Sequence, residues 1–193
     1  MVPAAVVALG FCSPALSQDL PNFEFRGHHI GQNVHEAFPS FFSNPDEHGL
    51  DYYCATNKAG FEYACGDPNI EKVNGYPQLG DVRIISVRYK VFEEKIFSVV
   101  VAFDADAFSD LVPMLSGKYG KPDAIRTEEL KTIGGGTVQN FIEEWKFKEG
   151  VLRISRYGAS IRYGNIEFEN APISARISAL ENADYEAKGK AAF

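Results

Sequence analysis

The chain has 193 residues, with 26 acidic and 19 basic side chains and a formal net charge of −7. This length fits one ordinary domain or two very small ones and excludes a large multidomain protein. Its 45% hydrophobic and 23% charged residues are typical of a packed globular domain and exclude a disordered chain. The acidic balance also argues against nucleic acid as a partner, because phosphate-binding proteins normally carry a basic face.

The beginning of the chain has the pattern of an export signal. No charged residue precedes Asp19, and an apolar run over residues 4–12 is followed by small residues at Ala15 and Ser17, the positions that a signal peptidase reads. We therefore expect a signal peptide over residues 1–17, although it lacks the usual basic start. The alternative is a buried N-terminal strand or helix.

The remaining chain, residues 18–193, is expected to form a single periplasmic or secreted domain. The apolar run is much shorter than the roughly twenty residues that cross a bilayer, so we expect no integral membrane segment after signal removal. Cys12 could indicate a lipid anchor, but Phe11 stands where a small residue would be expected.

Removal of the signal would leave Cys54 and Cys65 as the two cysteines of the chain. An even number of cysteines in an oxidising compartment predicts a disulfide between them. Residues 51–54 and 61–65 read as two aromatic strands around a turn that would bring the sulfur atoms together. A catalytic redox pair normally has the Cys-x-x-Cys spacing, which is absent here.

The hydrophobic pattern predicts an α+β fold in which helices pack on one face of an antiparallel sheet, and the order of elements reads as two helix-then-strands units. Short connections between the later strands favour hairpins, and therefore antiparallel pairing. The expected elements are a strand over 22–30, a capped helix from 34, a hairpin over 85–103 turning at Glu93 and Glu94, a helix over 108–119 ending at Gly120, strands over 138–148, 151–157 and 160–168 with a bulge at Gly164, and a last helix from Pro172.

This layout resembles small exported bacterial proteins of uncharacterised function. The features that carry the resemblance are the signal, the Phe25-Arg26-Gly27 strand end before a short aromatic helix, and a hairpin leading through Phe103 to a helix closed by Lys118-Tyr119-Gly120-Lys121-Pro122. The order of elements is also similar to the β-lactamase-inhibitor-like and outer-membrane assembly-lipoprotein-like folds. That resemblance implies a protein that presents its surface to other proteins and has no catalytic residues.

The candidate metal site is a group of three histidines, His28, His29 and His35. Imidazole is a common ligand for zinc and copper, and a strand end beside the first helical turn could bring one of the first two near His35. His28 and His29 are neighbours on an expected strand, so only one of them can face His35. No His-Glu-x-x-His or paired-cysteine pattern supplies a further ligand, and surface or capping roles are the alternative.

The candidate site for an anion or a protein partner consists of Arg153, Arg156 and Arg162. They fall on neighbouring expected strands with Tyr157 and Tyr163 between them, a combination that binds anionic groups. The alternative is cross-strand pairing of these arginines with Glu143, Glu144 or Glu167.

We expect an exported, non-catalytic binding module that needs no cofactor and recognises a protein or a small ligand. The alternative is a metal-dependent hydrolase that uses His28, His29 and His35. A concave pocket joining histidines and acids would favour the enzyme, whereas an exposed aromatic patch on the sheet would favour the binding module.

Overall fold

The computed structural model describes residues 20–38, 54–56, 63–66, 72–73, 75–132 and 134–191. The expected signal peptide, residues 1–17, lies outside the described residues. Among the described helices, none combines the length and the apolar character that crossing a bilayer requires.

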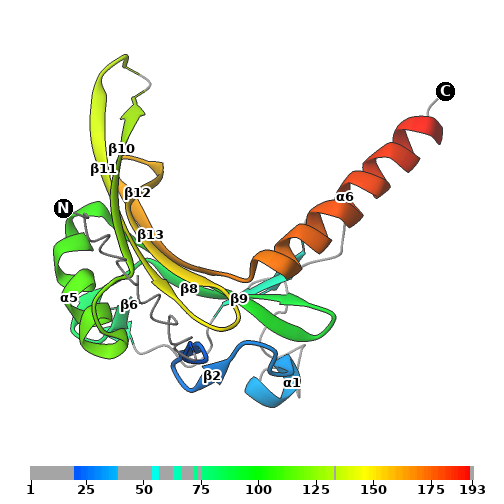
Figure 1. Cartoon of the computed structure of the whole chain (residues 1–193), viewed down its shortest axis with the longest axis horizontal. Coiled ribbons are helices and arrows are strands. Elements are labelled where there is room, and N and C mark those ends of the chain that lie inside the picture. The colour runs from blue at the N-terminus through cyan, green and yellow to red at the C-terminus, as the bar shows by residue number, and fades with distance from the viewer. Residues whose placement is uncertain are drawn as a thin grey trace, which may run out of the picture.

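The fold is an α+β arrangement around one eight-stranded antiparallel sheet, in the order β10-β11-β12-β13-β9-β8-β4-β3 (Figure 1). Every neighbouring pair in this sheet is antiparallel, as the short connections in the sequence predict. Its strands are β3 (Cys54–Thr56), β4 (Tyr63–Gly66), β8 (Ser86–Phe92), β9 (Lys95–Asp104), β10 (Ala124–Lys131), β11 (Thr137–Lys146), β12 (Val151–Ser160) and β13 (Tyr163–Glu169).

Helix α5 (Phe108–Tyr119) covers one face of this sheet. Leu111 and Leu115 of the helix are buried against the apolar side chains of the central strands, including Val101 and Phe103. The helix continues from a short 3-10 turn, η1 (Ala105–Ala107). It ends as the sequence predicts, because Gly120 adopts a φ of 84° that few other residues tolerate.

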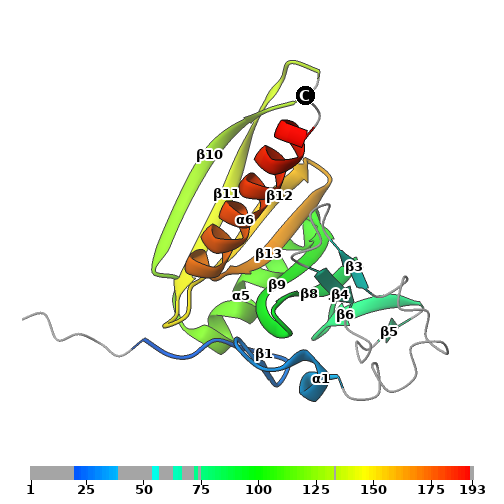
Figure 2. The ribbon, with the colours of Figure 1, turned by 90° about the vertical axis from the view of Figure 1, so that its right-hand side faces the viewer.

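Helix α6 (Ala171–Ala191) lies on the other face of the sheet. Figures 1 and 2 show α5 and α6 on opposite sides of the sheet. The expectation that the helices share one face is therefore wrong for α6. Its Ile177 is 4% exposed and packs on Phe92 and Phe97 in the β8–β9 hairpin, which turn away from the core contacted by α5.

The chain before β8 also forms small elements outside the large sheet. Helix α1 follows the expected cap, since the Asn33 side chain accepts a hydrogen bond from the His35 amide at 2.9 Å. Strands β1 and β2 form one small sheet, and β5, β6 and β7 form a second small sheet in that order. These elements are β1 (Glu24–Phe25), β2 (His28–His29), α1 (Val34–Ala37), β5 (Lys72–Val73), β6 (Tyr76–Leu79) and β7 (Val82–Arg83).

Two details of the sheet differ from the sequence expectation. Strand β10 was not expected, because its sequence Ala-Ile-Arg-Thr-Glu-Glu-Leu-Lys has few apolar residues. The irregularity expected at Gly164 lies instead on the partner strand, where the β12–β13 register shifts between Ser155 and Ser160. Gly164 itself pairs regularly with Phe103.

Candidate functional site

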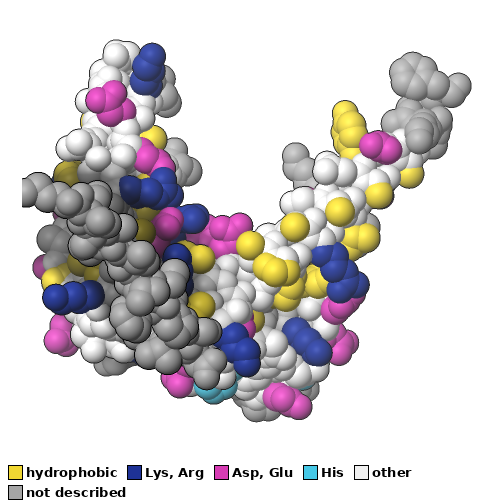
Figure 3. Space-filling view, in the orientation of Figure 1, with side chains coloured by type: hydrophobic (Ala, Val, Ile, Leu, Met, Phe, Trp, Pro, Cys, Tyr) yellow, Lys and Arg dark blue, Asp and Glu magenta, His cyan; other side chains and the backbone are white. Residues whose placement is uncertain are grey.

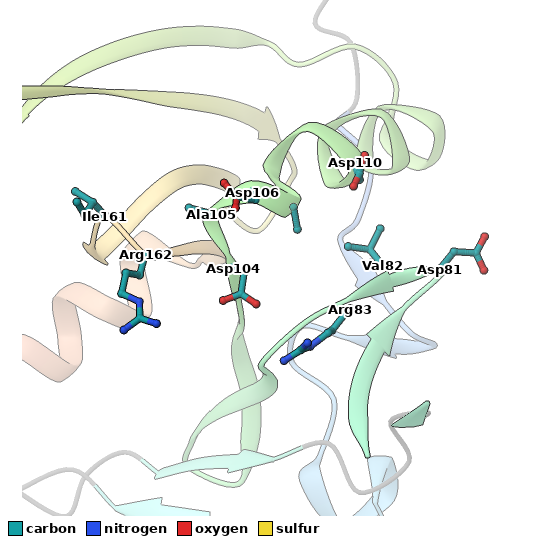
Figure 4. Close-up of a pocket in the computed structure, with 10 residues that line it drawn as sticks. Asp81, Val82, Arg83, Asp104, Ala105, Asp106, Asp110, Ile161 and Arg162 are labelled. Carbon is teal, nitrogen blue, oxygen red and sulfur yellow. The ribbon is translucent and has the colours of Figure 1, made fainter. Parts of the chain in front are cut away.

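A cleft of about 700 Å³ lies where several elements of the fold end together. The end of β9, η1 and the start of α5 form one side, and the β6–β7 turn and the β12–β13 turn complete it (Figure 4). The residues that line the cleft are Asp81, Val82, Arg83, Asp104, Ala105, Asp106, Ala107, Asp110, Ile161 and Arg162. We call this feature the aspartate cleft.

Backbone hydrogen bonds fix the geometry of the aspartate cleft. The Ala105 amide donates to the Arg162 carbonyl oxygen at 2.9 Å, which joins η1 to the β12–β13 turn. The Arg162 amide donates to the Ser160 hydroxyl oxygen at 3.3 Å within that turn. Asp104 is opposite Tyr163 in the sheet. The site is therefore built on the ends of paired strands, which position side chains more rigidly than free loops do.

Charged side chains dominate the lining of this cleft. It contains four aspartates and two arginines, and Figure 4 shows Asp104 between Arg162 and Arg83. The Arg83 guanidinium carbon lies 3.5 Å from the centre of the Tyr76 ring, so stacking holds this side chain in place. Within the described part of the chain, none of these six charged side chains forms an ion pair with another residue.

The chemistry of such a lining is recognition of charge. Four carboxylates against two guanidinium groups leave an excess of two negative charges in the cleft. A concave, acidic surface concentrates cationic groups and steers them to the site. The carboxylates accept hydrogen bonds from ammonium and guanidinium groups, and the two arginines would hold carboxylate or carbonyl oxygens beside them.

The three histidines do not enter this cleft. His28 is partly buried, with its ring 4.5 Å from the Phe38 ring and 5.3 Å from the Tyr89 ring. His29 and His35 are exposed. In the part of the chain that the structure describes, no group of three histidine, cysteine, aspartate or glutamate residues is arranged to hold a metal ion. His28 therefore has the surroundings of a packing side chain.

The three arginines are also separated. Arg153 lies on the sheet face away from α5, where its Nε donates to Glu144 at 2.7 Å and its Nη1 lies 3.7 Å from Glu169. Arg156 lies in the irregular part of β12, with its guanidinium carbon 5.3 Å from the centre of the Tyr157 ring. Only Arg162 lines the aspartate cleft. The cross-strand alternative thus holds for Arg153, whereas Glu167 pairs with Lys90 at 2.9 Å.

Two adjacent glutamates in β11 show how the sheet faces differ. Glu144 accepts hydrogen bonds from Arg153 and Arg126, and these hold its pKa below the usual range. Glu143 points to the other face, and partial burial raises its pKa. Consecutive strand residues point to opposite faces of the sheet, so Glu143 and Glu144 have different surroundings and their pKa values shift in opposite directions.

The two cysteines are brought together by the backbone register. Cys54 of β3 is directly opposite Cys65 of β4. Direct partners in antiparallel strands have Cα atoms about 4.5–5.5 Å apart, which lies within the range that a disulfide spans. The disulfide itself remains a prediction.

The second half of α6 extends away from the body of the protein. In its first half, Ile173, Ile177 and Leu180 pack on the β8–β9 hairpin, and Arg176 forms an ion pair with Glu93 at 2.6 Å. Tyr185, five residues beyond Leu180 along the helix, is 80% exposed. Figure 3 shows hydrophobic side chains along this helix and an open hollow between it and the sheet.

Sequence reasoning missed the aspartate cleft. Its residues lie far apart in the chain, from Asp81 to Arg162, and no motif joins them. The nearest signal was the run from Asp104 to Asp110 at a strand-to-helix junction. Comparison of the chain with protein-family models, with curated proteins and with solved structures yields no match.

Proposed function

We propose that this protein is an exported, non-catalytic binding module and that the aspartate cleft recognises a positively charged segment of a protein partner. The observation that carries the proposal is the cleft lining, which has four aspartates and two arginines with no ion pairs within the described residues. Side chains that are not neutralised internally are available to a ligand.

The charge of the whole chain supports a basic partner. The formal net charge is −7, so the long-range field attracts cationic molecules and accelerates their encounter with the cleft. The apolar side chains of Val82 and Ile161 at the cleft would contact the aliphatic part of a lysine or arginine side chain.

Export and presentation of surface are supported by the sequence. The uncharged N-terminal pattern is that of a signal peptide, and the register of Cys54 with Cys65 suits an oxidising compartment. The resemblance to β-lactamase-inhibitor-like proteins in the order of elements is consistent with a role in binding other proteins.

The proposal is tested by fluorescence anisotropy with a labelled, capped peptide of alternating lysine and glycine. We expect it to bind, and a glutamate–glycine peptide of the same length to bind much more weakly. Asp104→Asn should weaken binding about threefold, in the range for one partly exposed charge contact. Asp184→Asn is the matched control, since it removes the same charge from α6, where Asp184 pairs with Lys188.

Two results would overturn this function. Equal binding of the acidic and basic peptides would show that the carboxylates do not select the ligand. Equal weakening by Asp104→Asn and Asp184→Asn would show that only the net charge of the protein matters, and not the cleft.

A further inference from the structure

Strand β10 forms one edge of the large sheet and carries an unusual charge order. In the sheet it is paired with β11 alone, and Figure 2 shows no described element beside its outer edge. An edge strand presents unpaired amide and carbonyl groups to any other strand that can reach them. The side chains of β10 therefore decide which strand fits.

The hydrogen-bond pattern identifies the backbone groups at this edge. The Thr132 amide donates to the Gly136 carbonyl oxygen at 2.8 Å, in step with the register that pairs Lys131 with Thr137. Hydrogen-bonded and non-hydrogen-bonded pairs alternate along an antiparallel ladder. The even-numbered residues of β10 therefore bond to β11, and the backbone groups of Ile125, Thr127 and Glu129 point outward.

The charges of β10 are opposite on the two sides of Thr127. Arg126 precedes this residue and Glu128 follows it, while Ala124 and Leu130 occupy the next positions on the same face. An antiparallel copy of the strand centred on Thr127 would place each Arg126 opposite the Glu128 of the other copy. It would also place Ala124 opposite Leu130. The strand is thus complementary to itself.

We propose that two copies of this chain pair edge to edge through β10, antiparallel and with a two-fold axis at Thr127. In this arrangement the outward backbone groups of Ile125 bond to those of Glu129 in the second copy, and those of the two Thr127 residues bond to each other. The pairing joins two eight-stranded sheets into one and uses the same patch on both copies, as a two-fold interface requires.

The neighbouring registers are disfavoured by charge. If the two-fold axis is perpendicular to the sheet, residues on one face of β10 lie opposite residues on the same face of the second copy. The alternative registers nearest to the proposed one then have the axis at Arg126 or at Glu128 in place of Thr127. A centre at Arg126 places the two Arg126 side chains opposite each other, and a centre at Glu128 does the same for the two glutamates. Like charges directly opposite destabilise a strand pair, so a centre at Thr127 is favoured over both neighbouring centres.

Other features of the edge agree with this pairing. Ile125 is 68% exposed and lies beside the free edge, where a second copy would cover part of it. Arg126 already bonds to Glu144 at 3.2 Å and to Glu128 within its own strand. Its five donors allow one more carboxylate partner across the interface, so pairing extends an existing row of alternating charges.

The test uses sedimentation of the full chain over micromolar to millimolar concentrations. We expect a reversible dimer in the native protein. The Arg126→Glu variant and the Glu128→Arg variant each place like charges across the interface, and each should weaken the dimer at least about tenfold. An equimolar mixture of these two variants should form a heterodimer, because each carries the charges that the other lacks.

A second variant tests the backbone contacts. Thr127→Pro removes an outward amide without removing a hydrogen bond to β11, and proline is tolerated on an edge strand. This variant should be folded by circular dichroism and monomeric by sedimentation. A native chain that stays monomeric throughout would overturn the proposal. So would a dimer that survives in the Arg126→Glu variant, or a mixture of charge variants that fails to associate.

Discussion

The ring of Phe103 occupies the space that a side chain at position 164 would fill. A Cβ atom on Gly164 would lie 2.3 Å from two atoms of this ring and 2.7 Å from the Arg156 carbonyl oxygen. Phe103 is fully buried and its strand is paired with that of Gly164, so neither side can move freely. This contact fixes β9 against β13 next to Asp104, which lines the aspartate cleft.

Gly164→Ala should therefore destabilise the protein strongly. The added methyl group forces the ring or the backbone to shift, and overpacking of a core typically costs about 1–3 kcal/mol. Gly117→Ala is the control, because nothing lies within 4 Å of its Cβ position and alanine favours a helix over glycine by up to about 1 kcal/mol. Urea unfolding should give a lower midpoint for the first variant and an unchanged or higher one for the second. Equal midpoints would show that Phe103 adapts.

Glu144 and Glu143 should change the pH dependence of the free energy of unfolding in opposite directions. Arg153 and Arg126 lower the pKa of Glu144 in the folded protein. Ionised Glu144 therefore stabilises the fold at pH values above the pKa that this residue has in the unfolded chain. This stabilisation is lost as the pH falls through the pKa of the folded state. Glu144→Gln should lower the free energy of unfolding by about 1 kcal/mol at pH 7, and the difference from the native protein should disappear in acid.

For Glu143 the sign is reversed. Burial raises the pKa of Glu143 in the folded protein. The protonated side chain therefore favours the folded state at pH values below the pKa that Glu143 has in the unfolded chain. This effect is lost as the pH rises through the pKa of the folded state. Glu143→Gln should be neutral or stabilising by up to about 0.5 kcal/mol at pH 7. Denaturant titrations of both variants and of the native protein at neutral and acidic pH measure how the free energy of unfolding changes with pH in each case. A loss of stability at neutral pH in the Glu143 variant would contradict this account.

The first half of α6 should contribute to stability and the second half should not. Ile177 is buried in one cluster with Phe92 and Phe97, and truncation of a buried isoleucine costs about 2–5 kcal/mol. We expect Ile177→Ala to lower the melting temperature clearly. Tyr185 is 80% exposed, so Tyr185→Ala should change stability by less than about 0.5 kcal/mol. Calorimetry of the two variants distinguishes them, and a similar loss in both would mean that the projecting half is packed.

The disulfide between Cys54 and Cys65 should form when the protein is produced in an oxidising compartment. Intact mass measurement should find the native chain lighter by two hydrogen atoms than its reduced form. The Cys54→Ser variant should lose up to about 3 kcal/mol of stability, since the bond closes a short loop. Recovery of two free thiols from the native exported protein would show this prediction to be wrong.

The sequence predicted the elements whose signals are local. The hairpin that turns at Glu93 and Glu94 and the helix that ends at Gly120 are both present, because periodic apolar residues and a glycine cap are enough to define them. Strand β10 was missed, since none of its residues is buried and its sequence has no apolar alternation to detect.

The tertiary arrangement could not be read from local patterns. The side of the sheet on which α6 packs depends on Phe92 and Phe97, which face away from the core that Val91 and Ile96 enter. The aspartate cleft likewise depends on turns that meet only after the sheet has formed. Residue type alone grouped the arginines, but Arg153 pairs with Glu144 across two strands whereas Arg162 lies in the β12–β13 turn at the cleft.

The most direct measurement of the proposed recognition is a two-dimensional NMR titration of the amide signals with the capped lysine–glycine peptide. The proposed site predicts that the signals of Asp104, Ala105, Asp106 and Arg162 shift together and saturate, while those of the second half of α6 stay in place. Shifts confined to α6 or to the outer edge of β10, or no shift at the aspartate cleft at saturating peptide, would contradict the account.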